Sequence, residues 1–309
     1  MFRKVRRIVS ESVEAVYNAC FNRPIGYIYM FHKVCPKEDY LASIDELRVS
    51  PEYFEQFLLE QQKHVDFISI DEVPSRLIDA QLRKRPFCVI TFDDGYADNF
   101  TYAYPVLKKL GIPFVIYVSV GLVNDHTPIW NYPLILERIV RMHGELDIDG
   151  QRYYCNTQEQ KNETFVRLKA LLLSLPYQHL RDEFCRLFAD YLNPSVFAAD
   201  TLTWEQIEQL AADSLCTIGS HTMTHCRLTM TDAAALEYEL GHSKFVLEQH
   251  IGRPVVHLSY PYGWKNDVSP AAKAYARQAG YQTAMISWGG TVRHRDKDIY
   301  ALKRIMIHE

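Results

Sequence analysis

Short apolar segments alternate with amphipathic segments along most of this chain, and this alternation restricts its fold more than any other feature. Uninterrupted apolar runs predict buried strands at residues 25–31, 67–70, 87–92, 113–120, 216–219, 255–259, 283–287 and 300–307. Helical spacing of apolar residues predicts helices at residues 51–65, 71–82, 102–110, 160–175, 178–191, 203–212, 232–251 and 269–279. Apolar strands separated by helices are typical of a parallel sheet that is covered on both faces. The sequence therefore predicts an α/β fold, and with about eight strands an irregular (β/α) barrel.

One segment, at about residues 122–200, departs from the alternation because its pattern is mostly helical. We interpret it as a helical insertion between barrel strands, and such insertions often shape a substrate cleft or a partner surface. The predicted organisation is an N-terminal amphipathic helix at residues 1–24, followed by a barrel domain at residues 25–309 that carries this insertion. A chain of 309 residues is long enough for one domain of barrel size.

The N-terminal segment is basic and has apolar residues at helical spacing. Glu11 and Glu14 interrupt it and no long apolar core follows, which argues against a cleaved signal peptide. A helix packed on its own domain is one interpretation. The other is an amphipathic helix that rests on an anionic membrane, so that the protein is peripheral to the inner membrane. No apolar run is long enough to predict a membrane-spanning helix.

The net charge bears on the kind of partner that the protein binds, and the cysteine content bears on its cellular compartment. The formal net charge is −4, so the sequence predicts no nucleic-acid partner. The seven cysteines form no C-x-x-C pair, and Cys88 and Cys216 lie inside apolar, strand-like runs. We interpret the cysteines as reduced thiols, which favours a cytoplasmic location.

The first motif whose side chains could take part in catalysis is Thr91-Phe-Asp-Asp-Gly95, in which a predicted buried strand leads directly into Asp93 and Asp94. Catalytic groups of barrel enzymes lie at the carboxyl ends of strands. Neighbouring strand residues point to opposite sides, so that one aspartate can bind a metal while the other points elsewhere into the site. The alternative interpretation is an ordinary turn, because Asp-Gly is a common turn dipeptide.

The second motif contains His221 and His225, again directly after a strand-like run. On a helical turn this spacing of four would place both imidazoles on one face, close enough to share an ion. Two unrelated surface or core histidines are the alternative. One carboxylate and two histidines leave coordination positions open for water and substrate, as a catalytic metal site requires. The two motifs together therefore predict a divalent metal site.

A third motif, Tyr260-Pro-Tyr-Gly263, also follows a predicted strand. Pro261 and Gly263 would fix a loop that brings a backbone N–H to a substrate, although an ordinary strand–helix connection would have the same residues.

In this order, the three motifs resemble those of the polysaccharide deacetylase (NodB-homology) domain, carbohydrate esterase family 4. The resemblance extends from about residue 85 to the C-terminus, and residues 29–34, 49–55 and 67–73 are similar to the N-terminal part of bacterial members of surface-polysaccharide biosynthesis. It implies an irregular (β/α) barrel of about seven strands. It also implies a metal-dependent N-deacetylase whose substrate is an N-acetylated sugar in a glycan or in a lipid-linked glycan precursor.

The resemblance also implies a role for each residue that matches a motif. Asp94, His221 and His225 would bind one divalent ion, expected to be Zn²⁺, and Asp93 would be the general base that takes a proton from water. The backbone N–H of Tyr262 would hold the oxyanion. The substrate-binding residues would be Tyr96, Pro261, Tyr262 and Gly263.

Two departures from the family pattern concern the support of the base. Where the family has an arginine that pairs with the base aspartate, this chain has His257, and we expect Arg304 on the last strand to hold Asp93 instead. The D-x-x-D-W segment of the family is absent, and residues 287–290, Ser-Trp-Gly-Gly, occupy that region.

A further departure concerns the general acid. His308 would match the family's L-x-H motif, but it lies at the extreme C-terminus, where chains often fray. His32, at the end of the first predicted strand, is the other candidate, and it can equally be a histidine satisfied within the barrel wall.

These departures leave two alternatives to the deacetylase. One is a metal-containing glycan-binding protein that has lost activity, although such a protein has no need of Asp93. The other is an amidohydrolase that uses the same metal site on a small amide.

Overall fold

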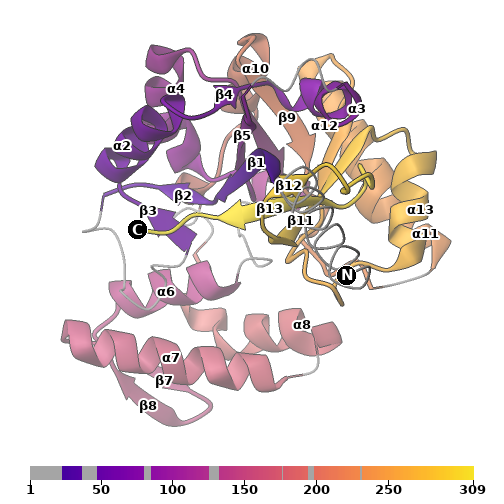
Figure 1. Cartoon of the computed structure of the whole chain (residues 1–309). Coiled ribbons are helices and arrows are strands. Elements are labelled where there is room, and N and C mark those ends of the chain that lie inside the picture. Colours follow the sequence, from indigo (N-terminus) through magenta and orange to yellow (C-terminus); the bar gives the residue numbers. More distant parts are fainter. Residues whose placement is uncertain are drawn as a thin grey trace, which may run out of the picture.

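The structure is a computed structural model that describes residues 23–36, 47–79, 85–124, 132–175, 177–193, 198–229 and 232–309. Seven parallel strands form its centre (Figure 1): β1 (Pro24–Phe31), β5 (Phe87–Phe92), β6 (Phe114–Val118), β9 (Cys216–Ser220), β10 (His257–Ser259), β11 (Thr283–Gly289) and β13 (Leu302–Met306). Strand β1 pairs with both β5 and β13, which closes the sheet into a barrel. The predicted barrel of about seven strands is therefore confirmed. The predicted N-terminal helix falls almost entirely on residues 1–22, which lie outside the described residues.

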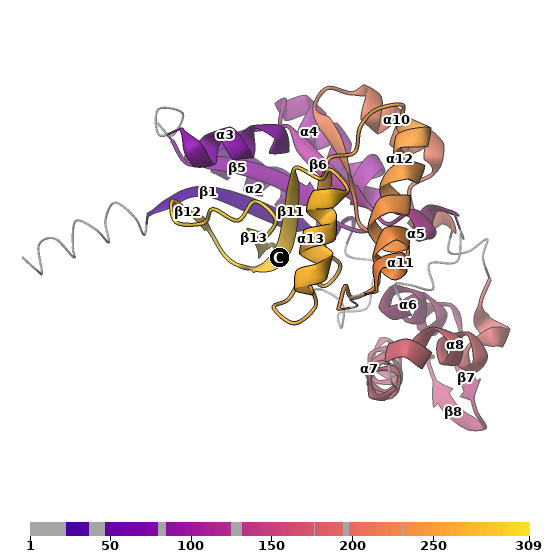
Figure 2. The same cartoon turned by 90° about the vertical axis from the view of Figure 1, so that its right-hand side faces the viewer.

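Helices cover the outside of the barrel, as Figure 2 shows for the side formed by the C-terminal half. They are α2 (Pro51–Gln62), α4 (Tyr104–Leu110), α10 (Trp204–Ala212), α11 (Ala233–Leu236), α12 (Ser243–Ile251) and α13 (Pro270–Gln278). Their ends follow local chemistry: Ser50 and Ser269 cap α2 and α13 with their side chains, and α4 ends at Gly111 in the left-handed conformation.

Several predicted elements differ in extent or type. The predicted strand 67–70 is reduced to β4 (Asp66–Phe67), because a 3₁₀ helix (Ile70–Glu72) and α3 (Val73–Ile78) follow at once. The long predicted helix 232–251 contains a π-helix (Glu237–His242) between α11 and α12. Further short strands are β2 (Lys33–Val34), β3 (Arg48–Val49) and β12 (Val292–Arg293).

The barrel interior is apolar at the amino ends of its strands. Ile28, Val89, Val115, Met285 and Leu302 form one buried cluster with side chains of α3 and of the 3₁₀ helix before it, which close this end. Two glycines make room for aromatic rings, because a Cβ atom at Gly26 would lie 2.3 Å from Phe87 and one at Gly219 would lie 2.4 Å from Tyr117. The buried side chains of Asp93, Asp94 and His221 lie at the opposite end, after the carboxyl ends of β5 and β9.

The insertion is a compact unit beside the barrel (Figures 1 and 2). It contains α6 (Tyr132–Met142), β7 (Glu145–Ile148), β8 (Gln151–Tyr154), α7 (Gln158–Ser174) and α8 (Tyr177–Leu187), whereas the short helix α5 (Val120–Asn124) before it packs in the core of the barrel. Its core is a separate apolar cluster that includes Phe165, Phe184 and Phe188. The sequence did not predict the β7–β8 hairpin, whose turn at Asp149 and Gly150 has left-handed backbone angles.

The end of the insertion is bonded to the loop that follows β5. The Leu202 N–H donates to the Gly95 carbonyl at 2.9 Å, and Thr201 forms an antiparallel bridge with Tyr96. The insertion therefore supports the loop that carries Asp93 and Asp94. Within the described residues, no helix is both long and apolar enough to cross a bilayer.

Candidate active site

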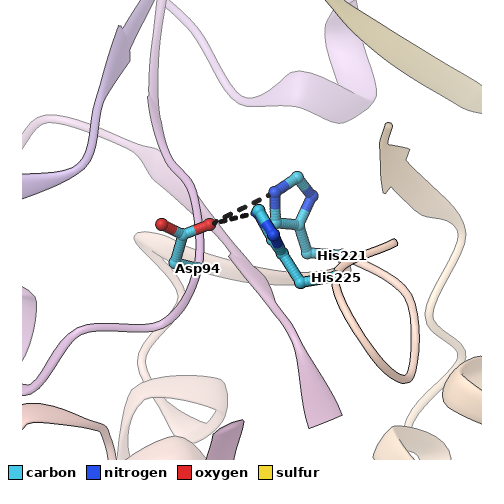
Figure 3. A group of neighbouring side chains, drawn as sticks. All are labelled: Asp94, His221 and His225. Carbon is cyan, nitrogen blue, oxygen red and sulfur yellow. Dashed lines mark ion pairs between the residues drawn. The ribbon is translucent and has the colours of Figure 1, made fainter. Parts of the chain in front are cut away.

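Loops at the carboxyl ends of the barrel strands bring the predicted metal ligands together (Figure 3). Asp94 follows β5, whereas His221 and His225 follow β9. The Asp94 Oδ1 atom lies 3.0 Å from His225 Nε2 and 3.3 Å from His221 Nε2. One ligand atom from each residue lies within 4.8 Å of the other two, so the three side chains point at one small volume.

Unusual backbone conformations produce this convergence. Among the described residues, five non-glycine residues have a positive φ, and four of them line this site: Asp94 (75°), Thr222 (70°), His225 (53°) and Tyr262 (59°). Each such conformation costs about 1–3 kcal/mol and persists only where the surrounding contacts enforce it. The prediction of a helical turn between the two histidines was wrong. Residues 221–225 form an irregular loop instead, and its left-handed residues turn both rings toward Asp94.

The hydrogen bonds of these side chains fit a bound divalent ion. The His221 Nδ1–H donates to the Ser259 carbonyl at 2.8 Å, which orients the ring so that Nε2 faces Asp94. Burial alone would raise the pKa of Asp94, but the charge and hydrogen bonds of His225 and His221 hold it well below its usual value. An ionised carboxylate and two imidazole nitrogens, from which a bound ion would displace any proton, form the donor set of a catalytic metal site.

A buried glutamate that sequence reasoning missed holds the histidine loop. Glu239, on the π-helix, is 6% exposed. Its carboxylate accepts hydrogen bonds from the Met223 N–H (3.1 Å), the Thr224 N–H (3.0 Å) and the Thr224 hydroxyl (2.6 Å). π-Helical turns often occur at functional sites. In the sequence, Glu239 is one charge among several in a long helical segment, so no local signal distinguishes it.

Asp93 pairs with Arg304 inside the barrel, and its Oδ2 atom also lies 3.9 Å from His221 Nε2. The two side chains form a bidentate ion pair, with 2.7 Å between Nη1 and Oδ1 and 2.6 Å between Nη2 and Oδ2. The Ser259 hydroxyl also donates to Asp93 at 3.2 Å. Burial alone would raise the pKa of Asp93, but the Arg304 charge keeps it below its usual value. The contact that the sequence predicted between Arg304 and Asp93 is therefore present.

His257, which occupies the position of the family arginine, has different partners. It lies two residues before Ser259 on β10, nearer the amino end of the strand, and it is fully buried. Its ring nitrogens are 2.8 Å from the Thr283 hydroxyl and 2.8 Å from Asp71 Oδ1. His257 thus links β10 to β11 and to the segment that closes the barrel, and Arg304 takes over the contact with the base.

The two candidate acids differ in their surroundings. His32 follows β1 and is half-buried, and the charges of Asp94, Asp93 and His221 act on it. Burial lowers the pKa of His32, although the two aspartates oppose this effect. His308 follows β13 and is exposed. Because Met30 pairs with Met306, each histidine lies two residues beyond a paired strand position.

The third motif forms a tight turn against the metal ligands. The Gly263 N–H donates to the Pro261 carbonyl at 2.6 Å, which with the positive φ of Tyr262 defines a three-residue γ-turn. The Tyr262 ring lies edge-on to His225, with 5.1 Å between ring centroids. A Cβ atom at Gly263 would lie 2.5 Å from the Ser287 hydroxyl, so only glycine fits there.

Tyr96 is placed differently from the prediction that it binds substrate. It is 1% exposed and belongs to the core cluster of the insertion. Its hydroxyl hydrogen-bonds the Asp94 carboxylate, and the Lys33 ammonium lies 4.3 Å from its ring centroid. Burial, together with the charge of Asp94, raises the pKa of Tyr96 well above its usual value, so the hydroxyl remains a donor. Tyr96 therefore positions a metal ligand and is closed to direct substrate contact.

The contacts of Glu239 generate a first prediction. Glu239→Gln keeps the size of the side chain but replaces an acceptor oxygen by an amide that donates, so the loop of His221 and His225 loses support. We expect the dissociation constant for Zn²⁺, measured calorimetrically on metal-free protein, to rise about 10–100-fold. Glu237→Gln, at an exposed position of the same π-helix, is the matched control and should bind Zn²⁺ as wild type does. Equal dissociation constants for the two variants would show that Glu239 has no such role.

Comparison with known proteins places this geometry in context. The family model for polysaccharide deacetylase matches residues 81–284. A curated relative, "Putative polysaccharide deacetylase YxkH" of Bacillus subtilis (strain 168), is 25% identical over 221 residues, which are 71% of this chain and 51% of the relative. The chain thus spans about half the length of that relative.

Solved structures share the fold at low sequence identity. The Streptococcus pyogenes deacetylase PplD, in complex with acetate, superposes with a TM-score of 0.60 at 18% identity, over 93% of this chain and 94% of its own. IcaB from Ammonifex degensii superposes with a TM-score of 0.56 at 18% identity, over 92% of each chain. Because the family model covers most of the barrel, from the strand before Asp93 to β11, the chain belongs to the polysaccharide deacetylase family.

Proposed function

We propose that this protein is a metal-dependent N-deacetylase that hydrolyses the acetamide of an N-acetylated sugar, within a glycan or a glycan precursor of surface-polysaccharide biosynthesis. The observation that carries the proposal is the position of Asp93, an ionised carboxylate fixed by Arg304 beside the Asp94, His221 and His225 cluster. A protein that only bound glycans would have no use for a second buried carboxylate at this place. PplD, which has the same fold, is a deacetylase whose structure holds acetate, the product that this reaction would release.

The ion would be held by Asp94, His221 and His225, and we expect it to be Zn²⁺. When bound, a divalent ion polarises a carbonyl and lowers the pKa of water. Asp93 takes the proton of the attacking water and passes it on. Because Arg304 keeps the pKa of Asp93 low, the carboxylate is a weak base, which is why we expect turnover to depend strongly on the ion.

The departing amine needs a proton, and we propose that His32 supplies it. His32 is half-buried and lies within the electrostatic reach of both aspartates, whereas His308 is exposed at the end of the chain. Burial lowers the pKa of His32 from its usual value, which favours the neutral imidazole, and His32 would gain its proton during the reaction. The turn of Pro261, Tyr262 and Gly263 would orient the acetamide, with the Tyr262 N–H beside the oxyanion.

The central test of this function is acetate release from a panel of N-acetylated glycans. With the metal-loaded protein, Asp93→Asn should lower kcat by about 10²–10⁴-fold while metal content stays at the wild-type level, because the ligands are intact. Asp182→Asn, at an exposed position of α8, is the control and should behave as wild type. Removal of the ion by a chelator should abolish turnover, and Zn²⁺ should restore it. Acetate release that a chelator does not affect would refute the mechanism.

The assignment of the acid predicts a difference between two alanine variants. His32→Ala should lower kcat at least about 10²-fold, whereas His308→Ala should keep most of the activity. The comparison requires equal metal content in both proteins. A larger loss in His308→Ala would reverse the assignment, and full turnover in both would exclude both histidines as the acid.

We further propose that the basic N-terminal segment brings the enzyme to the cytoplasmic face of a membrane, where lipid-linked precursors are made. The support is the sequence pattern of residues 1–22 alone. Fractionation of cells that express the full chain, or the chain without residues 1–20, tests this location. A full chain found wholly in the soluble fraction would contradict it.

A further inference from the structure

We propose that a cationic pocket beside the active site binds a carboxylate or phosphate group of the glycan, so that the substrate is an acidic polysaccharide. This inference rests on the proposed deacetylase function and adds to it the substrate class. The pocket has a volume of about 470 Å³. Its lining residues lie in the loop after β10, on α13, on β11 and in the segment from residue 295 to residue 303, which leads into β13.

The pocket begins directly behind the wall of the active site. The Ser287 N–H donates to the Gly263 carbonyl at 3.1 Å, and the Ser287 hydroxyl accepts from Arg304 at 3.3 Å. Ser287 thus touches both the substrate-binding turn and the partner of Asp93. Trp264 directly follows Gly263 in the chain, Trp288 directly follows Ser287, and both tryptophans line the pocket. We infer that a glycan whose acetamide lies beside Asp93 extends past Ser287 onto the two tryptophans.

The charge around the pocket is strongly positive. Two acidic residues, Asp296 and Asp298, line it together with five cationic ones: Lys265, Lys273, Arg295, Lys297 and Lys303. The acidic side chains are already compensated, since Asp296 lies 2.6 Å from Lys303 and Asp298 lies 3.5 Å from Lys273. Lys265 and Arg295 are exposed, and each has no ion pair within the described part of the chain. In a protein of net charge −4, this concentration of positive charge attracts an anion.

The tryptophans define what else the ligand must contain. Trp264 is 64% exposed, which is more than any other aromatic side chain among the exposed large hydrophobic residues of the described ranges. An exposed indole face offers a flat apolar surface for the C–H groups of a sugar ring. Lysine and arginine bind carboxylate and phosphate oxygens through charge-assisted hydrogen bonds. The combination fits a sugar that carries an acidic group, next to the N-acetylated sugar in the active site.

Nucleic acid also combines stacking bases with negative charge. The pocket adjoins a deacetylase site and the overall charge of the chain is negative, so we favour the acidic glycan. The experiment below includes a nucleic acid so that the two can be distinguished.

The test is calorimetric binding to metal-loaded Asp93→Asn protein, which does not require turnover. The probes are a hyaluronan hexasaccharide, which alternates N-acetylglucosamine with glucuronate, an oligomer of glycerol phosphate, a neutral chitin hexasaccharide and a thymidine oligonucleotide. We expect hyaluronan or glycerol phosphate to bind about tenfold more tightly than chitin at low salt. The preference should vanish near 1 M salt, where the Debye length is about 3 Å. The two acidic probes show whether the pocket selects a carboxylate or a phosphate.

Substitutions of pocket residues test whether this pocket causes the preference for acidic over neutral glycans. In the same background, Lys265→Ala with Arg295→Ala should remove the preference for the acidic probe, and Trp264→Ala should weaken the binding of both sugars. Arg152→Ala on β8 and Phe245→Ala on α12 are controls at exposed positions outside the pocket and should bind as the parent does.

Equal affinity for acidic and neutral sugars, an unchanged preference in the double variant, or tightest binding of the oligonucleotide would each overturn the proposal. These outcomes are separate from the failure of the deacetylase function, which would appear as absence of acetate release from every glycan.

Discussion

The buried ion pair between Asp93 and Arg304 is the interaction on which the rest of the site depends. It spans the barrel interior from the end of β5 to β13, with Arg304 only 1% exposed. Removal of one partner of such a pair leaves an uncompensated buried charge and typically costs about 3–5 kcal/mol. The pair therefore links the closure of the barrel to the ionised state of the base. Because the arginine comes from the last strand, the catalytic arrangement is complete only when the whole barrel has closed.

The metal half of the site depends on a different kind of support. Left-handed backbone at Asp94, Thr222 and His225 turns three ligands toward one point, and this strain is offset by contacts from outside the motifs. Glu239 holds the histidine loop, whereas Tyr96 and the returning end of the insertion hold the aspartate loop. The insertion and the π-helix thus act on the ligands through hydrogen bonds to the loops, in agreement with the fold's general use of strand ends for chemistry and outer elements for support.

The sequence predicted the site residues that lie directly after a predicted strand or on one. The barrel could be inferred from the alternation of strands and helices, and the convergence of Asp94, His221 and His225 from their places at strand ends. Arg304 could be named because the expected arginine is replaced by His257 and because Arg304 lies on the last predicted strand. Glu239, the burial of Tyr96 and the irregular path between the histidines depend on tertiary contacts between segments far apart in sequence, for which local patterns give no signal. The cationic pocket likewise forms from three separate segments that meet only in the folded chain.

A double-mutant cycle on the ion pair tests the central claim most directly, with the free energy of unfolding measured by denaturant titration for Arg304→Met, Asp93→Asn and the combination. The account predicts that Arg304→Met alone destabilises the protein by about 3–5 kcal/mol, because it leaves the Asp93 charge buried without a partner. The added Asp93→Asn change should recover a large part of this loss, which would appear as a coupling energy of about 1–3 kcal/mol. Additive effects of the two changes, with no coupling, would contradict the account.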